Sequence, residues 1–167
     1  MLTDEETLTD SEIRAYPAID CGYLHGDGYD RKRIDIFNTP NCEDNRARLD
    51  ALIQKLRKTP DSNGVILIYE GDLKYRVKTG NKYKTKFTPS EKGLAKDTIE
   101  YYKSHFKVRG FPLERITFIK AGFREDFTIE LWFVPKNIEI PRPLPTLKKI
   151  KQLEKTKKEF GFCGGIG

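Results

Sequence analysis

The chain has 167 residues, of which 37% are hydrophobic and 34% are charged. This length fits one domain with attached tails and argues against a two-domain enzyme. The longest apolar run, Val65–Tyr69, is far shorter than the roughly 18 to 20 residues of a membrane helix, so we expect no transmembrane segment. The first ten residues are acidic, whereas a secretory signal is basic and then apolar, so we expect no export signal in the given chain.

The net charge of +6 is unevenly distributed along the chain. Residues 1–12 contain five acidic residues and no basic one, whereas residues 74–86 contain six basic residues and no acidic one. Such segregation indicates a surface for an anionic partner, although a solvated face is the commoner meaning of a charge run. The six basic residues are Lys74, Arg76, Lys78, Lys82, Lys84 and Lys86.

An extended arm is predicted over residues 1–30, which are acidic at first and then rich in glycine. The pattern becomes regular at residues 31–38, where Ile34 and Ile36 alternate with charged neighbours. This alternation predicts a half-buried strand with both isoleucines on its inner face.

An amphipathic helix is predicted to begin after a cap at Asn41 and to end before Pro60. The next apolar run, Val65–Tyr69, predicts a central strand that is buried on both faces. The apolar face of the helix is formed by Leu49, Leu52, Ile53 and Leu56.

A β-hairpin is predicted over residues 73–87, on either side of the turn Thr79–Gly80–Asn81. Apolar residues and threonine alternate with cations on both strands. We therefore predict one aromatic face, which anchors the hairpin to the core, and one wholly cationic face. The residues of the first face are Leu73, Tyr75, Val77, Tyr83, Thr85 and Phe87.

A second helix is predicted to start at Thr88, with Pro89 at its first position and Glu91 closing a capping box. Two strands follow, over 116–123 and 128–135, and the short segment between them predicts an antiparallel pair. The apolar face of this helix contains Leu94, Ile99, Tyr102 and Phe106.

A proline-rich spacer and a basic tail are predicted over residues 139–167. The fold class is α+β, with a mixed sheet and two helices in the order strand, helix, strand, hairpin, helix, strand, strand. The domain is expected to span residues 31–138, between two extended arms.

Three cysteines, Cys21, Cys42 and Cys163, are too widely spaced for a zinc or thioredoxin-type motif. If one disulfide forms, we expect it between Cys21 and Cys42, and it would indicate an oxidising compartment; three reduced thiols are the default expectation. A thiol hydrolase that combines Cys42 with Asp20 and His25 has nothing in the sequence to fix its geometry.

Little in the sequence supports catalysis, and we predict that the protein is not an enzyme. Its two histidines are His25 and His105, and the common hydrolase, phosphate-loop and zinc-protease motifs are absent. The best metal candidate is the turn with His25, Asp27 and Asp30, which lacks the final glutamate of a calcium loop. No metal or cofactor is therefore expected.

Nucleic-acid binding is an alternative function. A lysine-rich hairpin that also carries Tyr75, Tyr83 and Phe87 offers both phosphate contacts and rings for base stacking. The predicted separation of rings and cations onto opposite faces counts against this alternative.

Three strings of the sequence resemble a known family when they are taken in order. They are ARLDALIQKLRKTPDSNGVILIYEGD, YYKSHFKVRGFPLERITFIKAGFRE and TIELWFVP. Together they resemble the OmpA-like domain, the peptidoglycan-associating module of bacterial envelope proteins, over Lys32 to Asn137. More narrowly, the chain looks like an uncharacterised branch with a divergent domain and a proline-rich tail. The resemblance implies a βαβαββ fold and a location in the bacterial periplasm or cell envelope.

The resemblance also implies a ligand site. In the family, an aspartate after the second strand and an arginine in a helix motif hold the diaminopimelate of the peptidoglycan stem. Asp72 matches the aspartate, but Thr98 stands where the arginine is expected and supplies no charged, bidentate contact. Arg76 and Arg124 are the candidates to replace it.

These observations favour a non-enzymatic binding or assembly subunit of the cell envelope. Its hairpin is expected to dock to an acidic protein surface, an anionic glycan or a lipid headgroup. The alternatives are an ordinary peptidoglycan-binding anchor and a nucleic-acid-binding protein. The expected patch for the partner contains Lys74, Lys78, Lys82, Lys84 and Lys86.

Overall fold

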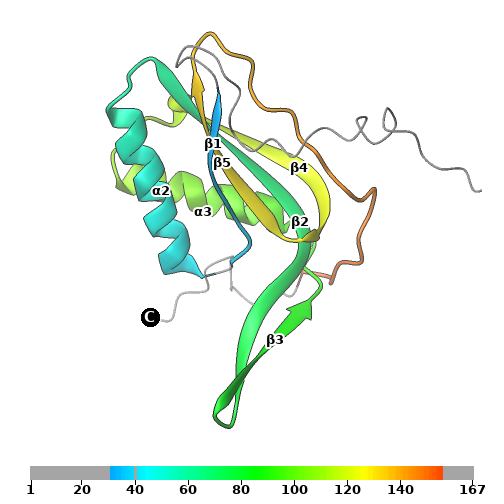
Figure 1. Ribbon diagram of the computed structural model, residues 1–167. Coiled ribbons are helices and arrows are strands. Elements are labelled where there is room, and N and C mark those ends of the chain that lie inside the picture. The colour runs from blue at the N-terminus through cyan, green and yellow to red at the C-terminus, as the bar shows by residue number, and fades with distance from the viewer. Residues whose placement is uncertain (1–30, 40, 156–167) are drawn as a thin grey trace, which may run out of the picture.

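The computed structural model describes residues 31–39 and 41–155. In this part the chain has an α+β fold, in which two helices pack on one face of a curved mixed sheet (Figure 1). No helix of the described part is both long enough and apolar enough to cross a membrane. The arm predicted over 1–30 lies outside the described residues.

Five strands form the sheet: β1 (Lys32–Phe37), β2 (Ser62–Thr79), β3 (Lys82–Thr88), β4 (Ile116–Asp126) and β5 (Thr128–Pro135). The order in the main sheet is β1-β5-β2-β4, and β3 pairs with the far end of β2. Strand β2 is parallel to β4 and antiparallel to β5 and β3. The predicted central strand and the first strand of the predicted hairpin are therefore one continuous 18-residue strand.

The prediction that β4 and β5 form an antiparallel pair is wrong, because they lie on opposite sides of β2. The short connection between them crosses β2 at Gly71. A Cβ atom at Gly71 would lie 2.4 Å from the carbonyl carbon of Asp126 and 2.5 Å from the carbonyl oxygen of Arg124. Only a residue without a side chain permits this crossing, and the connection is then fixed by a 2.9 Å hydrogen bond from Phe127 N to Asp72 O.

Helix α2 (Cys42–Arg57) confirms the predicted amphipathic helix. Asn41 caps it, since its side-chain oxygen accepts a 3.1 Å hydrogen bond from the backbone N–H of Asp44. The four predicted apolar residues of the helix are at most 2% exposed and pack on the sheet.

Helix α3 (Leu94–Val108) begins later than the predicted capping box, so that prediction is wrong. The buried Ser90 pairs instead with the C-terminal part of the chain, because its carbonyl oxygen accepts a 2.9 Å hydrogen bond from Leu153 N. The cap comes from a distant strand: the carboxylate of Glu70 accepts a 2.9 Å hydrogen bond from Ala95 N. A tertiary contact thus replaces the local one.

Strand β1 also departs from its predicted pattern. Phe37 is 7% exposed and lies in the core, whereas Ile36 is 47% exposed. A register shift between Arg33 and Asp35 changes the alternation, so the side chain that follows Ile36 points inward.

Residues 136–155, which we call the C-terminal strap, pack against the domain, although the sequence predicted a linker from residue 139 (Figure 1). Leu147 forms a β-bridge with Phe123 of β4, and the guanidinium of Arg124 donates two 3.2 Å hydrogen bonds to the carbonyl oxygen of Leu144. The strap passes so close to Gly122 that a Cβ atom there would lie 2.9 Å from Cβ of Pro145.

Candidate functional site

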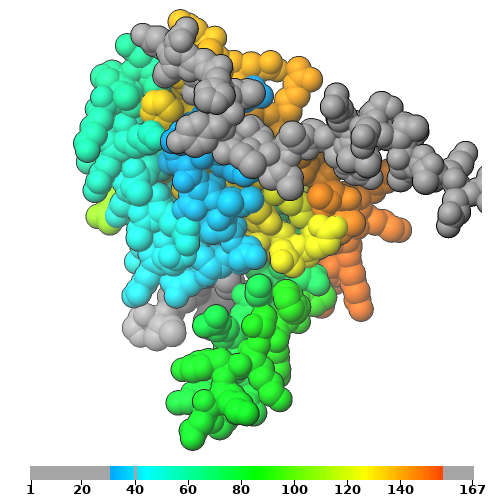
Figure 2. Space-filling view, in the orientation of Figure 1, coloured from blue at the N-terminus to red at the C-terminus, as the bar shows by residue number. Residues whose placement is uncertain are grey.

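The predicted hairpin is confirmed, and it projects from the body of the molecule (Figure 2, green). Seven facing pairs join β2 to β3, from Leu73 opposite Thr88 to Thr79 opposite Lys82. The turn has two residues, and its first, Gly80, has a φ of +61°. Glycine at this position is typical of the type II′ turn that joins tightly paired strands.

Both faces of the hairpin mix cations with rings or other uncharged side chains, so the prediction of one aromatic and one wholly cationic face is wrong. Residues that face each other across an antiparallel pair share a face. Lys74 lies opposite Phe87 and Lys78 opposite Tyr83 on one face. The other face carries the pairs Tyr75 with Lys86, Val77 with Lys84, and Thr79 with Lys82.

The aromatic rings of the hairpin do not anchor it to the core, contrary to prediction. Tyr83 is 66% exposed, Phe87 55% and Tyr75 41%. Lys74 Nζ lies 5.8 Å from the centre of the Phe87 ring, so ring and cation also contact each other. Rings and charges are thus presented together to solvent.

The cations of the hairpin are not neutralised within the described part of the chain. None of the six forms an ion pair or side-chain hydrogen bond there, in contrast to the arginines Arg48, Arg109 and Arg124 of the body. The body of the domain over 31–39 and 41–155 therefore does not use their charge.

An open cavity of ≈ 570 Å³ lies at the base of the hairpin, between its first residues and the connection from β1 to α2. Of the described residues that line it, two are cationic, Lys74 and Arg76, and none is acidic. The remaining lining residues are Asn38, Thr39, Asn41, Tyr75 and Thr85. The sequence predicts only a capping role for Asn41 and no role in a site for Asn38, Thr39 or Thr85, because nothing local indicates that the hairpin lies next to residues 38–39 and 41.

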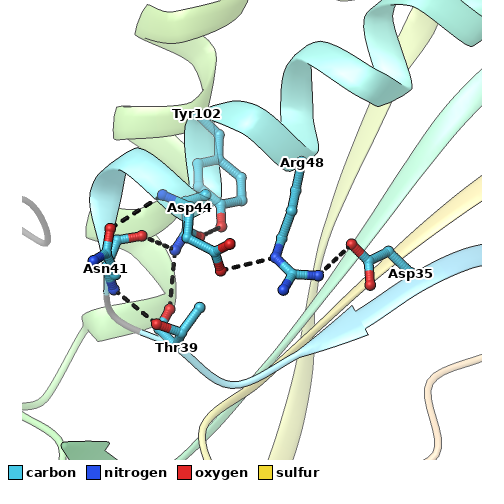
Figure 3. Close-up of polar contacts among 7 residues, drawn as sticks. Asp35, Thr39, Asn41, Asp44, Arg48 and Tyr102 are labelled. Carbon is cyan, nitrogen blue, oxygen red and sulfur yellow. Dashed lines mark hydrogen bonds and ion pairs between the residues drawn. The ribbon is translucent and has the colours of Figure 1, made fainter. Parts of the chain in front are cut away.

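Buried side chains fix the wall of this cavity (Figure 3). Asn45 donates hydrogen bonds of 2.9 Å to the carbonyl oxygen of Thr39 and 2.6 Å to that of Asn41. The hydroxyl of Tyr102 donates in turn to Oδ1 of Asn45, and both residues are fully buried. Burial raises the pKa of Tyr102 well above its ordinary value, so this donor keeps its proton.

Arg48 links helix α2 to strand β1 through an ion pair (Figure 3). Its guanidinium lies 2.6 Å from Oδ2 of Asp35 and 2.9 Å from Oδ2 of Asp44. Burial lowers the pKa of Arg48, but the hydrogen bonds to the two carboxylates outweigh it, and the pKa lies above its ordinary value. The cavity therefore has one rigid side and one side formed by the hairpin.

The four site residues implied by the resemblance are not gathered in one place. Thr98 is fully buried on the helix-covered side of the sheet, where its hydroxyl donates to Leu94 O at 2.8 Å. Arg124 lies on the other side, against Tyr69 and Glu130. Asp72 is half-buried on β2 and does not line the cavity at the hairpin base, whereas Arg76 does.

The side chain of Arg124 is held by contacts within the domain. Its Nη1 lies 2.9 Å from Oε1 of Glu130, which is only 3% exposed, and its guanidinium stacks 3.5 Å from the ring centre of Tyr69. The indole N–H of Trp132 donates to the other oxygen of Glu130 at 2.9 Å. The charge of Arg124 is thus used inside the domain.

A second cavity, of ≈ 360 Å³, lies between α2 and α3 and includes His105 and Arg109 among its lining residues. Oδ1 of Asp50 lies 2.8 Å from Nε2 of His105, and Arg109 donates to both oxygens of the carboxylate at 2.9 and 2.7 Å. Burial opposes ionisation of Asp50, but the hydrogen bonds from Arg109 and His105 outweigh it and lower its pKa. This cluster joins the two helices.

Cys42, at the start of α2, is disulfide-bonded. Both other cysteines, Cys21 and Cys163, lie outside the described residues, so the predicted pairing of Cys21 with Cys42 stays a prediction. The predicted metal and thiol-hydrolase candidates also involve His25 and its neighbours, which lie outside them. Over 31–39 and 41–155, no three His, Cys, Asp or Glu side chains are grouped as metal ligands.

Comparison with family models, curated proteins and solved structures gives no match for this chain.

Proposed function

We propose that the protein is a non-enzymatic binding subunit that captures an anionic partner with its projecting hairpin. One observation carries the proposal: six cations stand on an exposed two-stranded ribbon and have no carboxylate partner in the described part of the chain. A protein that placed them for solubility alone would have no need to gather them on one projecting element.

We further propose that this subunit belongs to the bacterial cell envelope. The succession of strand, helix, strand, hairpin, helix, strand and strand supports the OmpA-like resemblance on which this rests. The disulfide at Cys42 supports an oxidising compartment such as the periplasm.

Retention on immobilised heparin, used as a generic anionic polymer, tests the hairpin. A variant with Lys78, Lys82, Lys84 and Lys86 all changed to glutamate is compared with a matched control. The control changes four exposed lysines of the body to glutamate, namely Lys58, Lys96, Lys107 and Lys120. The hairpin variant should elute at much lower salt than the control, because it has lost four cations that bind heparin together from one ribbon. Equal losses would show that only net charge matters.

Nucleic-acid binding is the second candidate, and the mixed faces of the hairpin favour it. Rings beside cations on one surface are the arrangement that single-stranded nucleic acid requires. A mobility-shift titration tests this candidate: with six cations engaged, the logarithm of the binding constant should fall with that of salt concentration with a slope of about −4.

An ordinary peptidoglycan anchor has less support, since Thr98 is buried and Arg124 is held by Glu130. Sedimentation with purified cell walls tests it directly. Asp72→Ala should abolish co-sedimentation if the family's aspartate is used, and leave it unchanged if the hairpin is the binding element.

A further inference from the structure

The cavity at the base of the hairpin has the dimensions of a small-molecule site. Its volume of ≈ 570 Å³ lies within the range of about 300 to 1,000 Å³ that is usual for ligand pockets. It joins two parts of the chain that are distant in sequence: Asn38, Thr39 and Asn41 on one side, and the first residues of the hairpin on the other. One side is therefore set by the body and the other by the proposed binding element.

The chemistry of the lining selects for an anion that also carries hydroxyl groups. Lys74 and Arg76 supply two positive charges, and none of the described lining residues carries a carboxylate that would oppose them. A guanidinium forms paired hydrogen bonds with a carboxylate or a phosphate. Four of the remaining side chains are neutral amides or hydroxyls, which both donate and accept hydrogen bonds: Asn38, Thr39, Asn41 and Thr85.

The described lining residues offer a single ring to a planar base. This ring is Tyr75, which pairs with Lys86 and so belongs to the face of the hairpin opposite to Lys74 and Arg76. Phe87 shares the face of Lys74 but is not among the lining residues. A ligand with many hydroxyl groups fits this surface better than one that needs stacking.

The loop that supplies the amides and hydroxyls is held in place before any ligand arrives. Asn45 binds the carbonyl oxygens of Thr39 and Asn41, and Tyr102 binds Asn45 from the core (Figure 3). Asn41 N also donates a 3.1 Å hydrogen bond to Oγ1 of Thr39. The backbone carbonyls of Thr39 and Asn41 are therefore already held in place, which lowers the entropic cost of binding at these two residues.

We propose that this cavity binds an anionic saccharide unit, a sugar ring that bears a carboxylate or a phosphate. Arg76 and Lys74 hold the anionic group. The ring hydroxyls are bound by the side chains of Asn38, Thr39, Asn41 and Thr85. The face that begins at the cavity continues to Lys78 and Tyr83, so a longer anionic glycan extends from the cavity along the hairpin. This inference rests on the proposed function and names the partner class of the same element.

Nuclear magnetic resonance titration of the full chain tests the site with four probes. They are methyl glucuronide and glucose 6-phosphate as the two anionic sugars, methyl glucoside as the neutral sugar, and adenosine monophosphate as the nucleotide. At least one anionic sugar should bind saturably and shift the amide signals of Asn38, Thr39, Arg76 and Thr85. The neutral sugar should bind at least about tenfold more weakly, since it lacks the charged group.

A matched pair of variants separates the cavity from the rest of the hairpin. Arg76→Gln and Lys84→Gln each remove one exposed positive charge from the ribbon, but only Arg76 lines the cavity. Arg76→Gln should raise the dissociation constant of the anionic sugar by at least about tenfold. Lys84→Gln should change this constant by less than about twofold. Both residues are exposed, so neither variant is expected to alter folding, and circular dichroism checks this.

Three outcomes overturn the saccharide site: no saturable binding of either anionic sugar, equal binding of the neutral sugar, or tighter binding of the nucleotide. If heparin retention still depends on the hairpin lysines in such a case, the proposed function stands without this site. If retention is also indifferent to those lysines, both proposals fail.

Discussion

Lys78 lies directly opposite Tyr83 across the hairpin, so a cation of β2 and a ring of β3 share one face. The reason is the length of the turn. Both strands carry their cations at even-numbered positions, but a two-residue turn pairs even positions of one strand with odd positions of the other. A turn longer or shorter by one residue would have separated the rings from the charges.

Nuclear Overhauser contacts check this register. We expect contacts from the Tyr83 ring to the side chain of Lys78 and from the Phe87 ring to that of Lys74, because these residues face each other. A contact between the rings of Tyr75 and Phe87 would contradict the register, since it requires the wholly aromatic face.

Loss of one partner in the buried ion pair should destabilise the domain. Arg124→Met removes the 2.9 Å partner of the 3% exposed Glu130 carboxylate and leaves it with Arg33 at 3.7 Å, so urea unfolding should show a loss of about 2 kcal/mol. The double variant Arg124→Met with Glu130→Gln removes the poorly compensated charge and should recover part of that loss. A single variant as stable as the wild type would show that water reaches the carboxylate.

Gly71 should be the most sensitive glycine of β2. In Gly71→Ala the new methyl group meets backbone atoms of the β4–β5 connection at 2.4 to 2.7 Å, so the strands must separate, and we expect a loss of at least about 2 kcal/mol. Gly80→Ala is the control, because its Cβ meets nothing within 4 Å and only its positive φ opposes the change, at about 1 kcal/mol. Similar unfolding midpoints for the two variants would exclude the crossing at Gly71.

Asp50 should contribute stability that is lost in acid. Its pKa in the folded state lies below the ordinary value of 3.8, so the unfolded chain binds this proton more readily than the folded chain. The contribution is complete above pH 4 to 5 and disappears as the pH falls through the folded-state pKa. Asp50→Asn should therefore be less stable than the wild type at pH 7 and approach it in acid, as the pH falls below the folded-state pKa, measured by urea unfolding at each pH. A difference independent of pH would contradict this assignment.

Reduction should weaken the fold at the start of α2. Cys42 is disulfide-bonded, and removal of a native disulfide typically costs about 2 to 4 kcal/mol. Reductant should lower the melting temperature of the wild type and have no effect on Cys42→Ser. Peptide mapping under non-reducing conditions identifies the partner, which we predict to be Cys21; a peptide that joins Cys42 to Cys163 would contradict that pairing.

Several elements were predictable because their causes are local. The helix over Cys42–Arg57 follows from its cap and its apolar period, and the hairpin follows from period two on either side of a glycine turn. The α+β class follows from the succession of these patterns. Each of these signals depends only on residues a few positions apart.

The site itself depends on contacts between distant parts of the chain. Helix α3 begins at Leu94 because Glu70 of β2 caps it and because Leu153 N donates a hydrogen bond to Ser90 O. The residues near the start of the helix do not indicate either contact. The cavity exists because β2 continues past the sheet and brings Arg76 close to residues 38–39 and 41.

Period and charge along the chain were sufficient to identify a cationic hairpin, because alternation and composition are properties of neighbouring residues. The tertiary structure decided which side chains share a face and which lie at the cavity, because strand register and the packing of separate elements are set by the whole fold.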